Sequence, residues 1–188
     1  MLQEYLVPKS TAEALEVLAS YNGKARIIAG GTDLVLQMES GEHLLDAVVD
    51  VSGLTELCSI EQDERYTYIG AAVKHAELAA SPLINSIARC LALAADEVGS
   101  PQVRNAGTVG GNVINAQPAA DTALALTALN AEAEILSQKG IIWQPVAHLY
   151  EKPGVSKVDS TCQLMRRFRF FTPGSSTVSS YRRVGKCN

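Results

Sequence analysis

The sequence lacks several features that would assign it to a particular class of protein. Its four cysteines are scattered without a Cys-x-x-Cys pair, so the spacing of a zinc site or a local iron–sulfur cluster is absent. The three histidines lie in unrelated segments, which disfavours a metal site. No apolar run reaches the roughly 20 residues of a membrane-spanning helix, and no basic stretch followed by an apolar one opens the chain. We therefore predict a cytoplasmic protein that folds without disulfides and has no membrane partner.

Two common nucleotide-binding patterns are missing as well. Neither glycine-rich segment of the chain contains G-x-x-x-x-G-K-[ST], which excludes a phosphate-binding loop of that form. The dinucleotide pattern G-x-G-x-x-G fails too, because Gly30-Gly31-Thr32 lacks the third glycine and the segment at 107–111 does not follow a strand. Any nucleotide would have to be bound in another way.

The charges are unevenly distributed along the chain. Residues 1–150 hold 8 Lys and Arg against 18 Asp and Glu, whereas residues 151–188 hold 8 against 2. A basic tail can indicate nucleic-acid binding. Here, however, the arginines at 166, 167 and 169 alternate with Phe168 and Phe170, which predicts a strand with one solvent-facing side. We therefore predict no nucleic-acid partner.

Two glycine-rich segments, 27–34 and 107–112, are the most informative features that are present. Glycines in such segments leave backbone N–H groups open to an anion. The first segment follows an apolar strand and leads into a predicted helix over 33–38. Either segment alone is typical of a tight turn. Together, each with a threonine beside its glycines, they favour one elongated diphosphate ligand held from both sides.

The first 55 residues predict a small parallel α/β unit. A capping box formed by Ser10 and Glu13 begins a helix that ends at Gly23. Apolar runs at 26–29 and 45–51 flank the helix at 33–38, so the strand–helix–strand order favours parallel pairing.

Residues 56–170 predict a larger mixed α+β unit. Its expected elements are a strand at 66–73, helices at 74–80 and 83–98, a turn at 99–105, a helix at 122–129, a hairpin joining 133–136 to 141–143, and the strand that includes 166–170. Trp143 is interpreted as a packed hairpin residue.

The motifs at 29–34, 102–105 and 108–112, together with Asp121, resemble the FAD-binding subunit of molybdenum hydroxylases, the medium-chain family of xanthine dehydrogenase and carbon monoxide dehydrogenase. The resemblance covers essentially the whole chain. It implies an α+β, two-subdomain FAD-binding fold of the PCMH/vanillyl-alcohol-oxidase type. The implied parts are a first FAD-binding subdomain at 1–55, a second at 56–170, and the start of a truncated C-terminal domain at 171–188.

The resemblance also implies which residues bind FAD. The first segment would wrap the diphosphate with its N–H groups, the second would hold its other side and the adjoining sugar, and Asn115 and Asp121 would accept hydroxyl groups. An apolar contact is expected from Leu164 or Met165, with Met165 preferred, and Arg182 stands where the family usually has a lysine near the flavin. The expected cofactor-binding residues are Ile27, Ile28, Ala29, Gly30, Gly31, Thr32, Asp33, Leu34, Thr108, Val109, Gly110, Gly111, Asn112, Asn115, Asp121, Met165 and Arg182.

By the same resemblance, the chain would pass electrons to NAD or another acceptor. The electrons would come from a molybdopterin-binding large subunit through a 2Fe-2S small subunit, and no catalytic nucleophile or acid–base pair is expected on this chain. Another flavoenzyme of the vanillyl-alcohol-oxidase type is an alternative. A different alternative is a truncated, non-catalytic or vestigial interaction protein, for which residues from about 171 onward would be poorly ordered or docked differently from the family. If these residues have only structural roles, Asp121 caps a helix, and Asn112 and Asn115 are turn residues.

Overall fold

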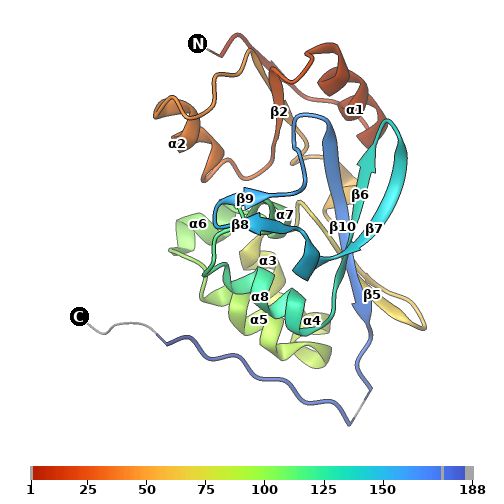
Figure 1. The fold of residues 1–188 in the computed structure, drawn as a ribbon. Coiled ribbons are helices and arrows are strands. Elements are labelled where there is room, and N and C mark those ends of the chain that lie inside the picture. The colour runs from red at the N-terminus through yellow and green to blue at the C-terminus, as the bar shows by residue number, and fades with distance from the viewer. Residues whose placement is uncertain (1, 175, 185–188) are drawn as a thin grey trace.

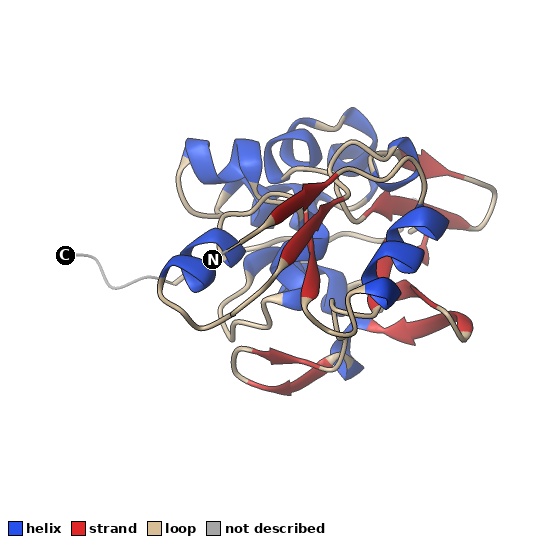
Figure 2. Cartoon of the chain, turned by 90° about the horizontal axis from the view of Figure 1, so that it is seen from above, coloured by secondary structure: helices blue, strands red, loops and turns tan. Residues whose placement is uncertain are grey.

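The computed structural model describes residues 2–174 and 176–184, which form a small parallel sheet and a larger antiparallel sheet. The small unit lies at the top of Figure 1, and Figure 2 looks down onto its three strands. Its elements are β1 (Glu4–Leu6), α1 (Thr11–Ser20), β2 (Ala25–Ile28), α2 (Leu34–Glu39) and β3 (Ala47–Asp50), with strand order β1-β3-β2. The strand β1 was not predicted.

The helix and the parallel strands of the small unit confirm the prediction. The Ser10 side chain accepts a hydrogen bond from the Glu13 N–H at 3.1 Å and so caps α1. Strand β3 pairs in parallel with both β1 and β2. Leu15 and Leu18 of α1 are buried in one cluster with Val49 of β3, so α1 packs against the small sheet.

The larger unit is a five-stranded antiparallel sheet with helices on one face. Its strand order is β4-β5-β10-β6-β7, so β10 is the central strand. The strands are β4 (Ile60–Gln62), β5 (Tyr66–Gly70), β6 (Glu132–Ser137), β7 (Gly140–Pro145) and β10 (Gln163–Phe171). The helices are α3 (His75–Ala80), α4 (Pro82–Ile87), α5 (Arg89–Asp96), α6 (Pro101–Ala106), α7 (Val109–Ile114) and α8 (Asp121–Ala128). A short hairpin, β8 (Tyr150–Lys152) with β9 (Val155–Ser156), and the 3-10 helices η1 (Thr55–Leu57) and η2 (Val146–His148) complete the described elements.

Alternation along β10 confirms that this basic strand has one core face and one wetter face. Phe168 and Phe170 are buried in the cluster that the helices share with the sheet. On the opposite face Arg169 donates to Glu132, and its guanidinium carbon lies 3.9 Å from the centre of the Trp143 ring. The arginines of this strand are therefore paired within the sheet. Trp143 packs against this arginine row on the hairpin that was predicted.

Two predicted elements are wrong, the helix at 83–98 and the turn at 99–105. The single helix expected at 83–98 is two helices, because Ala88 adopts φ −140° and ψ 56° between α4 and α5. The turn expected at 99–105 is helix α6, whose first turn is capped by Ser100 and begins with Pro101. Proline fits the first position of a helix as well as it fits a turn, so Ser-Pro marks a helix start here. The predicted strand at 66–73 also ends earlier, at Gly70.

The segment after β10 contains no helix or strand within residues 172–174 and 176–184. It runs along the helices at the bottom of Figure 1. The N–H of Cys90 donates to the Ser179 hydroxyl oxygen at 3.3 Å, and Tyr181 packs against the larger core cluster. The Arg183 guanidinium donates to the Glu97 carbonyl at 2.8 Å. These contacts dock residues 179–183 on α5 and α8. The sequence predicted the start of a C-terminal domain at 171–188. Of this range, residues 175 and 185–188 lie outside the described residues.

Among the described helices, none is long and apolar enough to cross a membrane.

Candidate functional site

A cleft of about 570 Å³ lies where the small unit meets helices α6, α7 and α8 and strand β9. This volume is within the range of about 300–1,000 Å³ that is common for small-molecule sites. The cleft brings together most residues that the sequence singled out. Those that line it are Ile27, Ile28, Ala29, Gly30, Gly31, Thr32, Asp33, Leu34, Thr108, Gly110, Gly111, Asn112, Asn115, Asp121 and Met165.

The two glycine-rich segments touch each other at Gly30. A Cβ atom added to Gly30 would lie 2.3 Å from the Ala106 carbonyl oxygen and 2.8 Å from the Gly107 Cα. Only glycine fits at such a separation. The close backbone approach at this position therefore joins the small unit to the helical layer and places both segments on one cleft.

The first segment offers a row of unpaired backbone donors. Strand β2 is held to its end, since Ile27 N–H donates to the Ser160 carbonyl at 3.0 Å and Val51 N–H donates to the Ile28 carbonyl at 3.0 Å. Beyond it, none of the N–H groups of residues 29–34 donates a hydrogen bond within residues 2–174 and 176–184. Gly31 has φ +68°, which turns the backbone in the way that glycine tolerates best. Successive open N–H groups in a turn form an anion-binding concavity.

The second segment differs from the prediction because its N–H groups are already used. Val109 N–H donates to the Val73 carbonyl at 3.0 Å, and Gly110 N–H donates to the Ala71 carbonyl at 2.8 Å. Gly111 N–H donates to the Thr108 hydroxyl oxygen at 3.2 Å, which caps α7. These N–H groups are therefore not open to an anion. A Cβ at Gly110 would also lie 2.8 Å from Ala71 Cβ, so this glycine serves close packing.

Asn112 of α7 and Asp121 of α8 line the cleft, and each already uses part of its hydrogen-bonding capacity. The Asn112 side-chain oxygen accepts from the Thr122 hydroxyl at 2.6 Å and from the Ala123 N–H at 3.2 Å. This leaves the amide N–H₂ as the polar group that Asn112 can present to a ligand. Asp121, 7% exposed, is the first residue of α8 and does not cap it.

The Asp121 carboxylate holds the C-terminal segment. It accepts hydrogen bonds from the Tyr181 hydroxyl and, at 3.4 Å, from the Arg183 guanidinium. Burial and the bond to Asp121 raise the pKa of Tyr181 to about 12, so this hydroxyl stays protonated and donates. A carboxylate has about four acceptor sites, so Asp121 can accept a ligand hydroxyl as well.

Val109 and Arg182 do not line the cleft, unlike the other residues expected to bind the cofactor. Val109 is fully buried in the helical core. Arg182 is exposed, because Tyr181 and Arg183 on either side of it hold the segment against Asp121. For the apolar contact, Met165 lines the cleft, whereas Leu164 points to the opposite core cluster.

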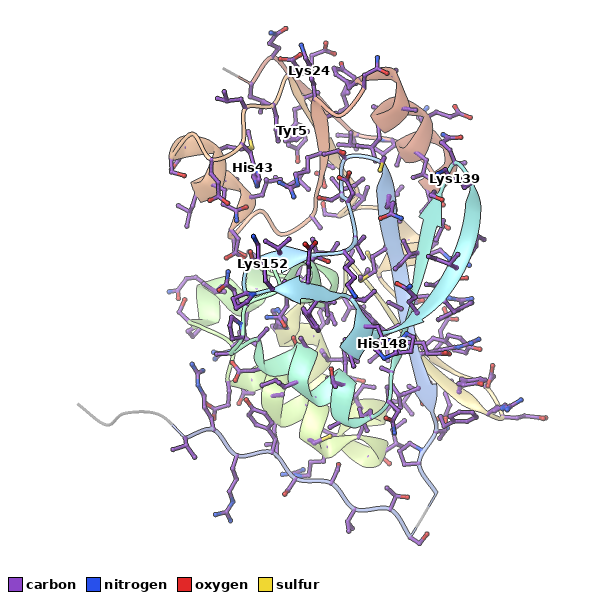
Figure 3. All side chains as sticks on the ribbon, viewed as in Figure 1. Tyr5, Lys24, His43, Lys139, His148 and Lys152 are labelled. Atoms are coloured by element: carbon purple, nitrogen blue, oxygen red, sulfur yellow. The ribbon has the colours of Figure 1, made fainter. Side chains whose placement is uncertain are left out.

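Sequence reasoning missed a polar group at the small-unit end of the cleft. The Arg26 Nε donates to the Ser160 hydroxyl at 2.7 Å, and its Nη1 contacts the His43 ring. Figure 3 shows His43 in the segment that follows α2. Burial and the Arg26 cation lower the pKa of His43, so its ring is neutral at physiological pH. These residues are far apart in the sequence, and no local pattern could have found them.

Sequence reasoning also missed His75 at the start of α3. This residue lines the cleft, is 2% exposed, and has a ring Nδ1 without a hydrogen-bond partner in the part of the chain that the structure describes. Burial lowers its pKa to about 4, partly offset by the Asp121 carboxylate.

The donors of this cleft fit a dinucleotide such as FAD. The open N–H row suits a diphosphate, and the asparagine and aspartate suit the hydroxyl groups of a sugar. The glycine contact at residue 30 lets the two segments meet along an elongated ligand.

Comparisons with known proteins agree with this geometry. The family model described as "FAD binding domain in molybdopterin dehydrogenase" matches residues 1–169. The nicotinate dehydrogenase FAD-subunit of Eubacterium barkeri is 32% identical over 186 residues, which are 97% of this chain and 63% of that relative. A putative xanthine dehydrogenase FAD-binding subunit of Escherichia coli (strain K12) is 33% identical over 76% of this chain and 49% of its own length.

A solved structure, carbon monoxide dehydrogenase from Hydrogenophaga pseudoflava, superposes with a TM-score of 0.93 at 25% identity, covering 100% of this chain and 65% of that one. This match confirms the predicted α+β fold class. The chain spans about half to two thirds of the length of the curated relatives named here.

Proposed function

Because this chain belongs to the family of FAD-binding domains of molybdopterin dehydrogenases, we propose that it is the FAD-binding electron-transfer subunit of a heteromeric molybdenum-containing hydroxylase or dehydrogenase. The names of its relatives support the assignment, since several are FAD-binding or medium subunits of dehydrogenases. Bound FAD would supply the redox chemistry, and the protein would orient it and exclude water from it.

The observation that carries the proposal is the row of open N–H groups at residues 29–34. These donors are fixed before a ligand arrives, because β2 is anchored on both sides and Gly30 is pressed against the Ala106 carbonyl. Preorganised donors lose little freedom when they bind a diphosphate. Thr32 would add a hydroxyl donor, and Asn112 would add an amide donor on the facing wall.

The remaining partners follow from the same assignment. Electrons would reach the flavin from a molybdopterin-binding large subunit through a 2Fe-2S small subunit, and would leave to NAD or another acceptor. The substrate would then be chosen on the large subunit. This division of labour is consistent with a cleft whose described lining offers hydrogen-bond donors for a nucleotide.

The proposal is tested by the absorption spectrum of the purified chain after incubation with FAD and gel filtration. Retained flavin gives an absorption band at about 450 nm, which is a property of the cofactor itself. We expect about one flavin per chain for the wild type. A matched pair of variants, Gly30→Ala at the contact and Gly53→Ala where nothing lies within 4 Å, separates the cleft from general effects of replacing glycine.

The expected result is loss of the band in Gly30→Ala and its retention in Gly53→Ala. A folded wild-type chain that retains no flavin would contradict the proposal. Anaerobic addition of NADH to the loaded chain then tests the acceptor: bleaching of the band supports NAD, and an unchanged band favours another acceptor.

A further inference from the structure

Arg26 and His43 form a polar pair at the small-unit end of the cleft. The Arg26 Nε donates to the Ser160 hydroxyl at 2.7 Å, and its Nη1 donates to the His43 Nε2. Strand β2, the loop after α2 and the loop before β10 therefore meet here (Figure 3). Both side chains are half-buried and line the cleft, so a ligand can approach them.

The pair keeps N–H groups that a ligand can use. A guanidinium only donates, so His43 Nε2 must accept from Arg26, and the proton of the neutral ring is on Nδ1. This Nδ1 and the Arg26 Nη2 have no partner within residues 2–174 and 176–184, yet neither is among the fully buried unpaired atoms there. Both therefore retain accessible surface. Arg26 also takes part in none of the ion pairs of the described residues.

This end of the cleft adjoins the row of open N–H groups. Arg26 and Ile28 lie on the same face of β2, because side chains alternate along a strand. The Ile28 Cδ1 would lie 3.3 Å from a Cβ at Gly31, which belongs to the row. At roughly 3.3 Å per residue, Arg26 lies about 10 Å before residue 29 along the chain. A nucleoside attached to a diphosphate at residues 29–34 can span that distance.

The polar groups of the cleft indicate which half of the dinucleotide lies at this end. The facing wall, with Asn112 and Asp121, suits hydroxyl groups, and the ribityl chain of the flavin half has three of them. The Arg26 end offers N–H donors, and the Gln37 side chain lines the cleft there with an amide that both accepts and donates. The Gln37 carbonyl accepts from the His43 N–H at 3.4 Å, which places the two residues together. A glutamine amide can pair with the amino group and a ring nitrogen of adenine at once.

We propose that Arg26, His43 and Gln37 bind the adenine base of the dinucleotide at the small-unit end of the cleft. This inference rests on the proposed function, because it requires a dinucleotide in the cleft. Ring nitrogens of the base accept from Arg26 and His43, and Gln37 accepts from the amino group. Ser160 holds the guanidinium in place. These residues determine the affinity for the base and take no part in electron transfer.

The experiment measures the affinities for FAD, ADP, UDP and inorganic pyrophosphate. Arg26→Met removes the donors and keeps a side chain of similar length. Arg89→Met is the matched control, because Arg89 is exposed at the start of α5 and lies outside the cleft lining. We expect Arg26→Met to weaken FAD and ADP by the same factor of about 10 to 100, as for the loss of hydrogen bonds from a charged group. Pyrophosphate should bind both proteins alike, and Arg89→Met should behave as the wild type.

The choice of base gives a further readout. ADP and UDP share the diphosphate and the ribose, so they differ only in the base. The wild type should bind ADP more tightly than UDP, and Arg26→Met should lose most of this preference. Equal affinities for ADP and UDP in the wild type would overturn the adenine assignment.

A third measurement needs no substitution. The chain has three histidines, so their ring protons can be assigned by NMR in the wild type. With ADP bound, the adenine H2 and H8 protons should show nuclear Overhauser contacts to the His43 ring. This arm remains informative if Arg26→Met does not fold. Contacts of the adenine only to residues of α7 or α8 would overturn the proposal.

The outcomes separate the two proposals. A wild type that binds neither FAD nor ADP contradicts the proposed function itself. A wild type that binds both, with equal affinities in Arg26→Met, overturns only the adenine site. Weaker FAD binding with unchanged ADP binding would place the flavin half at Arg26. An equal loss for ADP and pyrophosphate would show that Arg26 attracts the phosphates. Either result overturns the adenine site.

Discussion

The two glycine-rich segments look alike in sequence but are used in opposite ways. Residues 29–34 keep their N–H groups open, whereas Val109, Gly110 and Gly111 donate theirs to Val73, Ala71 and Thr108. The first segment is thus a surface for an anion, and the second is a packed joint that brings helix α7 against β5 and its following turn. A glycine pair therefore predicts a close approach of the backbone, and the long-range partners decide whether a ligand or the protein itself makes that approach.

The largest effect is expected where the two segments touch. Gly30→Ala would place a Cβ 2.3 Å from the Ala106 carbonyl oxygen, so one backbone must move. We expect a loss of stability of about 3 kcal/mol or more and loss of flavin retention, because overpacking against backbone has no cheap relief. Urea unfolding and flavin retention measure the two effects. Stability equal to that of Gly53→Ala would show that the segments are not in close contact.

The buried histidine at the junction gives the second effect, which depends on pH. The folded-state pKa of His75 is about 4 against an ordinary value of 6.5, so the unfolded chain binds this proton more readily. Stability should therefore fall as the pH drops from about 6.5 to 4, by about 3 kcal/mol from this group, and no further below that.

Urea unfolding at pH 7 and pH 4 in the wild type and in His75→Asn isolates this contribution. The carboxylates titrate in both proteins, so the difference between the two pH dependences belongs to His75. An equal pH dependence in both proteins would contradict the buried neutral state of His75.

A smaller effect is expected at the packed joint of the second segment. Gly110→Ala places a Cβ 2.8 Å from both the Cβ and the carbonyl oxygen of Ala71, so the backbone must shift, but by less than the 2.3 Å contact at Gly30 requires. We expect a loss of stability of about 2 kcal/mol. Flavin affinity per folded molecule should change less than in Gly30→Ala, since the Gly110 N–H is not available to a ligand. A variant with normal stability and abolished flavin binding would reverse the roles of the segments.

The sequence could predict the elements that depend on local patterns, and it could not predict those that depend on distant partners. Apolar runs and the Ser10 cap located β2, β3 and α1, and alternation located β10. Ser100-Pro101 predicts a turn but begins helix α6, because serine followed by proline is common at the start of both turns and helices. Most residues that were expected to bind the cofactor line the cleft. The reason is that both glycine-rich segments lie where the small unit meets the helices of the larger unit.

The use of the second segment's N–H groups could not be predicted from the sequence. It depends on carbonyls of residues 71 and 73, more than 30 positions away, and on their exact register beside α7. The same holds for Arg26 and Ser160, whose contact joins β2 to the loop before β10. His75 carried no local signal, because a single histidine near a helix start is ordinary until its burial and its unpaired Nδ1 are known.

The smallest effects are expected when the threonine of each segment is replaced. One replacement should mainly lower stability, and the other should mainly lower flavin affinity. The Thr108 hydroxyl oxygen accepts from Gly111 N–H at 3.2 Å, so Thr108→Val removes a helix cap and should cost about 1 kcal/mol of stability. The Thr32 hydroxyl only donates to the neighbouring Asp33 carboxylate at 3.1 Å, so Thr32→Val should leave stability within about 0.5 kcal/mol of the wild type. Flavin affinity should show the opposite order, falling more in Thr32→Val than in Thr108→Val. Urea unfolding and flavin titration of both variants give the four values. If both variants lost stability and affinity in the same proportion, the two segments would have the same role. That result would contradict the distinction between an open and a packed glycine segment.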